Sequence, residues 1–215
     1  MICNDHYAVI DTETGGLSEK TNPICEVAFI ILDKDLNEVA RHERIIKNYN
    51  SLEGKPLVYA PQALAVHGIS MAEINAGMAI KDALVEMDSI FKKYCKGASK
   101  VILVGHNMAY DNKMIKYAYD VCKMDMNKHT ADQYLCTMKM SHMAWGHDDK
   151  MENFKLPTCC ERIGVNIADS HRGLADVIST VELFKHHMSN LRNVSTTTAV
   201  AKRVDEFERS HGFRF

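Results

Sequence analysis

The sequence lacks any long hydrophobic run, because no stretch of its 215 residues approaches the ~20 apolar residues of a membrane-spanning helix. Its N-terminus, MICNDHYAVID, also lacks the basic segment followed by an apolar segment that is typical of an export signal. We therefore expect a cytoplasmic protein, of a bacterium or of a host cell if the protein is viral. We expect no membrane partner.

The chain also lacks an excess of charge, since its formal net charge is −2. A strongly basic coat that binds long nucleic acids by releasing counterions is therefore excluded, and a nucleic-acid contact should be short or assisted by a metal ion. The seven cysteines are odd in number and contain no CxxC pair, which favours reduced thiols over a disulfide framework. The histidines and cysteines lack zinc-finger spacing, which argues against a structural zinc.

A hydrophobic fraction of 46% and a charged fraction of 25% are ordinary for a globular protein, and the length suits one generous domain. We expect this domain to span 1–190, leaving 191–215 as a polar tail with room for one short helix at 199–209. The apolar patterns predict an α/β fold with a central mixed five-stranded sheet flanked by helices. The predicted strands are 9–11, 24–33, 37–46, 101–106 and 134–137, and the predicted helices are 80–96, 108–122, one through 160–163, and 172–189.

Two acids follow the first predicted strand in the stretch AVIDTETGG, residues 8–16. Side chains alternate between the two faces of a strand, so Asp11 and Glu13 should point the same way. Two like charges side by side repel each other. The pair therefore requires a partner that compensates for the repulsion.

Further acids occur in two other segments, GHNMAYD (105–111) and HRGLAD (171–176). Asn107 and Asp111 are four residues apart at the start of a predicted helix, which should stack them on one face. His171 directly precedes another predicted helix. Asp176 lies off the apolar stripe of that helix, so packing does not explain it.

Together these segments predict a cluster of four carboxylates, which could not all remain ionised unaided. Hard Mg²⁺ or Mn²⁺ ions prefer oxygen ligands, and about two such ions would neutralise about four carboxylates. The remaining coordination positions could accept a phosphate oxygen. The charge balance therefore indicates phosphoryl transfer.

In their order and separation, DTETGG, GHNMAYD and HRGLAD resemble the three exonuclease motifs of the DnaQ-like 3′-to-5′ exonucleases of the ribonuclease H-like superfamily. The histidine five residues before the last aspartate is similar to the DEDDh branch. The sister branch has a tyrosine four residues before that aspartate, where this chain has Arg172. The resemblance covers roughly residues 7–188.

This resemblance implies a ribonuclease H-like fold and a metal-dependent hydrolase that releases 5′ mononucleotides from 3′ ends. It implies that two divalent ions, Mg²⁺ or Mn²⁺, are held by four acids, with His171 as the general base; the four acids are Asp11, Glu13, Asp111 and Asp176. It also implies substrate-binding roles for Thr12, Leu17, His67, Ile69, Asn107 and Tyr110. The chain departs from the family pattern in having Tyr110 where phenylalanine is frequent and Cys136 where an accessory aspartate is frequent.

We expect single-stranded 3′ ends as the substrate, with DNA preferred over RNA. An enzyme that trims RNA or hydrolyses small oligoribonucleotides on the same fold is the alternative. A catalytically silent binding module attached to a polymerase or clamp is a third alternative, and a homodimer or a polymerase partner in proofreading during DNA replication would suit the active enzyme. A weaker resemblance links DTETGG to the phosphotransferase loop of haloacid-dehalogenase-like enzymes, with GHDDK (146–150) as its later acid pair.

Overall fold

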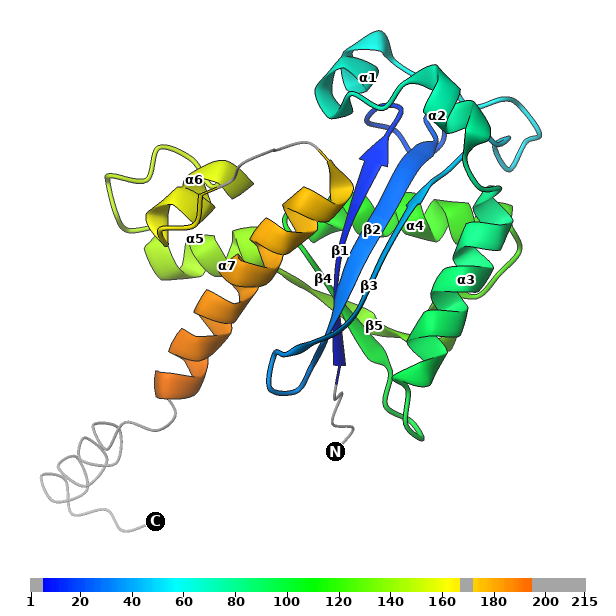
Figure 1. Ribbon diagram of the computed structural model, residues 1–215. Coiled ribbons are helices and arrows are strands. Elements are labelled where there is room, and N and C mark those ends of the chain that lie inside the picture. Colours follow the sequence, from blue (N-terminus) through cyan, green and yellow to red (C-terminus); the bar gives the residue numbers. More distant parts are fainter. Residues whose placement is uncertain (1–5, 167–171, 195–215) are drawn as a thin grey trace, which may run out of the picture.

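Five strands form one mixed sheet in the computed structural model, which describes residues 6–166 and 172–194. The strands follow the order β3-β2-β1-β4-β5, so β1 lies at the centre (Figure 1). The first three pair antiparallel, whereas β4 runs parallel to β1 and to β5. The prediction of a mixed five-stranded sheet is confirmed. The bounds are β1 (His6–Thr14), β2 (Ile24–Asp33), β3 (Glu38–Ile45), β4 (Val101–Gly105) and β5 (Thr130–Cys136).

Helices cover both faces of the sheet. One face packs against α3 (Ile80–Lys93) and α4 (Met108–Val121), and the other packs against α7 (Gly173–Val194). Beside α7 lie α5 (Thr137–Trp145) and α6 (Leu156–Arg162), while the short η1 (Met126–Lys128) precedes β5 (Figure 1). The predicted helices 80–96, 108–122 and 172–189 are confirmed within a few residues. The predicted tail helix at 199–209 lies outside the described residues.

Two short helices, α1 (Pro61–His67) and α2 (Met71–Ala76), lie beyond the end of β1 and were not predicted, nor was α5 (Figure 1). Both carry clear signals in the sequence. Proline starts α1, and Gly68 ends it in the left-handed conformation at φ 69°. Ser70 and Glu73 form a reciprocal capping box at the start of α2.

Alternation along the central strand decides which helix each side chain of β1 meets. Ala8 and Ile10 belong to the core beneath α3 and α4, whereas Val9 belongs to the core beneath α7. Continuing this alternation places Asp11 and Glu13 on the α7 side and Thr12 on the α4 side. The strand therefore distributes the residues of the acidic stretch over both faces of the sheet.

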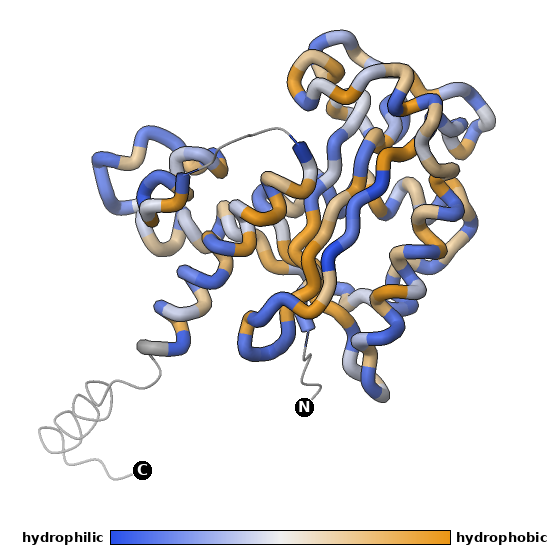
Figure 2. Tube along the Cα trace, in the orientation of Figure 1, coloured by the Kyte–Doolittle hydropathy of each residue, from blue (hydrophilic) through white to orange (hydrophobic). Residues whose placement is uncertain are grey.

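The neighbouring strand β2 is the most apolar element of the sheet. Every residue from 24 to 32 is buried, and hydrophobic colours gather in the inner part of the sheet, while the edge strand β3 and the loops are largely hydrophilic (Figure 2). One charged residue, Glu26, interrupts this buried stretch and is 0% exposed. No helix among the described residues is long and apolar enough to cross a membrane.

Candidate active site

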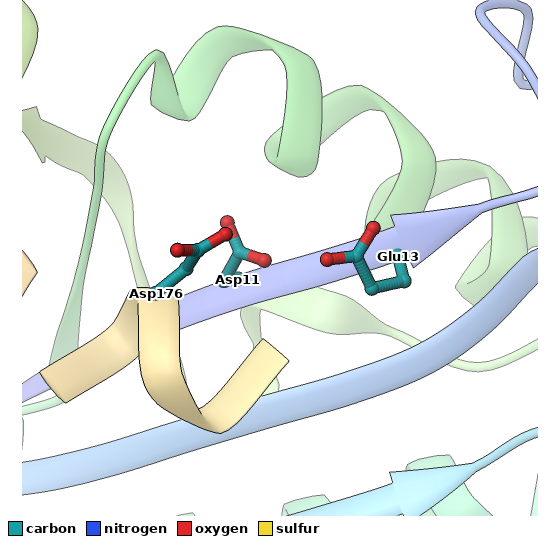
Figure 3. Close-up of side chains that lie close together, drawn as sticks. All are labelled: Asp11, Glu13 and Asp176. Carbon is teal, nitrogen blue, oxygen red and sulfur yellow. The ribbon is translucent and has the colours of Figure 1, made fainter. Parts of the chain in front are cut away.

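Three carboxylates converge where β1 meets the first turn of α7. One oxygen from each of Asp11, Glu13 and Asp176 lies within 4.8 Å of the other two. Figure 3 shows Asp11 and Glu13 on the same side of β1, with Asp176 facing them from α7. Within the described part of the chain, no other trio of His, Cys, Asp or Glu comes together in this way. The expectation that Asp11 and Glu13 share a face agrees with this arrangement.

The fourth predicted acid, Asp111, lies at the start of α4 and is only 3% exposed. Its Oδ1 accepts hydrogen bonds from the backbone N–H of Thr12 at 3.0 Å and from the Thr12 hydroxyl at 2.7 Å. The parallel pairing of β1 with β4 covers only Tyr7 to Val9. Asp111 therefore satisfies a backbone donor of β1 beyond the point where β4 has ended.

Asn107 lies just before α4 and not within it. Asn107 precedes α4 in the left-handed conformation, with φ 63°, and its side chain makes no capping hydrogen bond. Because the helix begins only at Met108, the helical spacing on which the predicted stacking of Asn107 and Asp111 was based does not apply to Asn107.

Burial and mutual repulsion make the acids of this cluster hard to ionise. The pKa of Asp11 lies well above its ordinary value, first because the carboxyl is buried and next because Asp111 is close. Burial, followed by the charge of Asp176, raises the pKa of Glu13 to about 8. Burial raises the pKa of Asp111 to about 7, although the hydrogen bonds from Thr12 oppose the shift.

The donor set fits hard divalent cations. The three converging acids offer only carboxylate oxygens, with no sulfur or nitrogen ligand among them. A cation would also relieve the repulsion that raises the pKa values of Asp11 and Glu13. The predicted general base, His171, lies outside the described residues.

A pocket of about 650 Å³ opens beside the acids, a size that suits a small ligand. Four of the predicted substrate-binding residues line it, namely Thr12, Leu17, His67 and Tyr110. Ile69 is not among the lining residues, since it is 2% exposed and packs with buried Cys25 and Ile74, and its substrate-binding role stays a prediction. The remaining lining residues are Glu13, Thr14, Gly16, Asn22, Ala60, Gln62, Ala63 and Val66.

Helix α1 supplies the wall of the pocket that sequence reasoning missed, through Gln62, Ala63 and Val66. The opposite wall is braced by Tyr110, whose hydroxyl donates to the Gly16 carbonyl at 2.8 Å and lies 2.5 Å from the Thr14 hydroxyl. A phenylalanine could not make these bonds. The tyrosine therefore ties α4 to the turn that follows β1.

A family model described as an exonuclease matches residues 8–184, most of the chain. The chain belongs to this exonuclease family. The match confirms the predicted DnaQ-like 3′-to-5′ exonuclease and its ribonuclease H-like fold.

The exonuclease does not bring the acids of GHDDK to its acidic cluster, because Asp148 instead pairs with Arg162 at 2.6 Å. The haloacid-dehalogenase-like alternative is therefore wrong.

Similar curated proteins share the name Ribonuclease T. The exonuclease is 26% identical to Ribonuclease T of Shewanella baltica strain OS185 over 210 residues, which cover 95% of this chain and 90% of the relative. It is also 26% identical to Ribonuclease T of Vibrio campbellii, with 82% of both chains covered.

Solved structures of exonuclease I share the fold. One, described as suggesting how processivity is achieved, superimposes with a TM-score of 0.70 at 18% identity. Another, of E. coli exonuclease I with a dA16 oligonucleotide, gives a TM-score of 0.68 at 18% identity. The alignments cover 91% and 89% of this exonuclease but only 44% and 43% of those chains. At this identity the likeness establishes the fold alone.

Proposed function

We propose that this exonuclease removes 5′ mononucleotides from single-stranded 3′ ends in a reaction that depends on two divalent ions, Mg²⁺ or Mn²⁺, with DNA preferred over RNA. The observation that carries the proposal is the convergence of Asp11, Glu13 and Asp176 beside a pocket of about 650 Å³. Asp11, Glu13, Asp111 and Asp176 would hold the ions. When bound, the ions would supply charge neutralisation and polarisation of the terminal phosphodiester.

The pocket would receive the terminal nucleotide. Ala63 and Val66 offer apolar surface, and Tyr110 offers an aromatic ring. Leu17 is 82% exposed at the pocket, so binding a nucleotide would bury apolar area that water now covers. These contacts would orient the last phosphodiester bond toward the acids.

His67 would add a polar contact. Its Nδ1 accepts a hydrogen bond from the Ile69 N–H at 3.0 Å, so Nε2 carries the hydrogen when the ring is neutral. Burial lowers the pKa of His67 and so favours that neutral form. Its Nε2 has no hydrogen-bond partner within the described protein. We therefore assign it as a donor to the substrate, and by its position in HRGLAD we assign His171 as the general base.

The names of the relatives support a nucleic-acid end as the substrate without choosing between DNA and RNA. One relative is a ribonuclease by name, and one exonuclease I structure is a complex with a DNA oligonucleotide. Trimming of RNA therefore stays the alternative. The cytoplasmic location, the polymerase partner in proofreading and the homodimer also stay predictions.

The test uses DNA and RNA oligomers of matched sequence, labelled at the 5′ end, with Mg²⁺, Mn²⁺ or EDTA. We expect ladders that shorten by one nucleotide from the 3′ end with either ion, faster on DNA, and none in EDTA. A blocked 3′ end should stop the reaction. Asp176→Asn should abolish the ladder, whereas the exposed Asp149→Asn should retain it. Faster cleavage of RNA would reverse the preference, and binding without cleavage would favour the silent module.

A further inference from the structure

Glu26 lies beside the active site but is neither a candidate metal ligand nor a pocket-lining residue. It is 0% exposed and stands directly opposite Glu13 in the pairing of β1 with β2. Its neighbour two residues on, Ala28, packs in the core beneath α7, so Glu26 faces the same side as the acidic cluster. A buried carboxylate opposite another acid is unfavourable by itself. Specific contacts must offset this cost.

Those contacts hold the start of α7. The Glu26 Oε2 accepts a hydrogen bond from the backbone N–H of Gly173, the first residue of α7, at 2.9 Å. The approach is close, because a Cβ added at Gly173 would lie 3.0 Å from that oxygen and 3.1 Å from the Ala28 Cβ. The first N–H groups of a helix have no partner within the helix and need a hydrogen-bond acceptor from outside it. Glu26 therefore fixes α7 against β2 at its first residue.

Arg172 extends the contact to a third element. Its Nη2 lies 3.6 Å from the Glu26 Oε1, and its Nη1 lies 4.0 Å from the Glu73 Oε1 of α2. Glu73 is itself held by the capping box with Ser70. The arginine thus links β2, the start of α7 and the helix that follows the pocket wall.

We propose that Glu26 is a positioning residue that sets the place of Asp176 in the metal site. Asp176 lies three residues after Gly173, within the same turn of α7, so the hydrogen bond at Gly173 fixes the height and rotation at which this carboxylate meets Asp11 and Glu13. A partner that orients a metal ligand in this way typically changes metal affinity about 10- to 100-fold when it is removed. The proposal rests on the metal-dependent function proposed above.

Two conservative variants of Glu26 distinguish the effect of its side-chain length from the effect of its charge. Glu26→Gln keeps an oxygen at the same distance from the Gly173 N–H but removes the charge. Glu26→Asp keeps the charge but shortens the side chain by one methylene, so its oxygen no longer reaches. Binding of Mn²⁺ is measured by calorimetry, together with the Mn²⁺ dependence of kcat and the metal-free Tm.

We expect Glu26→Gln to bind Mn²⁺ within about 3-fold of the wild type, and Glu26→Asp to bind it about 10-fold more weakly, with most of kcat recovered at saturating Mn²⁺. Leu84→Ala is the matched control. Leu84 is buried in α3 on the opposite face of the sheet, so this change lowers Tm and should leave Mn²⁺ affinity unchanged.

The proposal is overturned if Glu26→Asp binds Mn²⁺ like the wild type, since Glu26 would then only pack in the core. It is also overturned if Glu26→Gln is impaired as strongly as Glu26→Asp, because the charge would then act directly. Failure of the proposed function has a different signature. In that case the wild type would bind Mn²⁺ and release no nucleotide, while the two variants would still differ in Mn²⁺ affinity.

Discussion

The two elements that supply the acidic cluster place their carboxylates by different means. On β1, Asp11 and Glu13 share a face because strand side chains alternate, and the strand is fixed by pairing with β2 along its length and with β4 at its start. On α7, Asp176 depends on how a whole helix docks, through Val177, Val181 and Phe184 in the core and Glu26 at the helix start. Local geometry decides the first half of the site, and tertiary packing decides the second.

The largest effect should come from removing one ligand from either element. Asp11→Asn and Asp176→Asn each keep the side-chain volume and lose a carboxylate, and we expect each to lower kcat by at least about 10³-fold. The measurement is nucleotide release from a 5′-labelled oligomer at saturating Mn²⁺, with Asp149→Asn as control. Activity retained in Asp176→Asn alone would mean that α7 contributes shape rather than a ligand.

A smaller effect should follow from removing one of the hydrogen bonds that hold the Asp111 carboxylate in place. Thr12→Val keeps the backbone N–H bond to Asp111 and loses the hydroxyl bond of 2.7 Å. We expect Mn²⁺ affinity to fall about 10-fold, as for other partners of metal ligands. Thr130→Val, which removes another buried hydroxyl far along the sheet in β5, serves as the control. Equal Mn²⁺ affinities in the two variants would exclude a role for the Thr12 hydroxyl.

The raised pKa of Glu13 should make the stability of the folded protein depend on pH. The pKa of Glu13 is raised from its ordinary value of 4.5 to about 8, so the folded state holds this proton more tightly than the unfolded chain does. The protonated Glu13 therefore stabilises the fold fully below about pH 4.5, and this stabilisation is lost as the pH rises through about 8. In EDTA, we expect the Tm of the wild type to fall relative to Glu13→Gln by about 5 °C between roughly pH 5 and 8.

Mn²⁺ should reverse this loss in the wild type, because the cation replaces the proton as the partner of the carboxylate. The same titration of Glu13→Gln supplies the control, since this variant has no carboxyl group to titrate at that position. Parallel Tm curves for the two proteins in EDTA would contradict the raised pKa of Glu13.

The smallest effect should come from the pocket wall. Tyr110→Phe removes the hydroxyl that donates to the Gly16 carbonyl and contacts Thr14, and we expect a loss of about 1 kcal/mol in the free energy of unfolding. Because phenylalanine keeps the ring, KM should rise only about 2- to 5-fold, with kcat nearly unchanged. Denaturant unfolding and steady-state kinetics check both values. A large fall in kcat would instead place the hydroxyl at the reacting phosphate.

The sequence predicted the features that depend on short-range periodicity. Period-two alternation predicted that Asp11 and Glu13 share a face, and the apolar stripe of α7 left Asp176 unexplained by packing. It did not predict that Thr12 faces Asp111, because that contact depends on where β4 stops beside β1. Glu26 was missed for a similar reason, since its partner Gly173 is 147 residues away.

One wall of the pocket was not predicted because a short helix forms it. Helix α1 has only seven residues, too few for a helical period to stand out, and its proline and glycine ends were the available signals. Ile69 was assigned to substrate binding by the family resemblance and not by any periodic pattern. In the structure Ile69 lies in the short connection between α1 and α2, and its side chain packs with Cys25 and Ile74.

The continuous burial of β2 has a consequence for the chain before it folds. Val27 to Leu32, VAFIIL, is a six-residue segment with high strand propensity, no charge, no proline and no glycine, which is the signature of a segment prone to aggregate. Glu26 precedes it directly and Asp33 follows it. In the unfolded chain these two acids act as gatekeepers that discourage the segment from stacking on copies of itself. The carboxylate that later fixes a helix thus first protects the nascent strand.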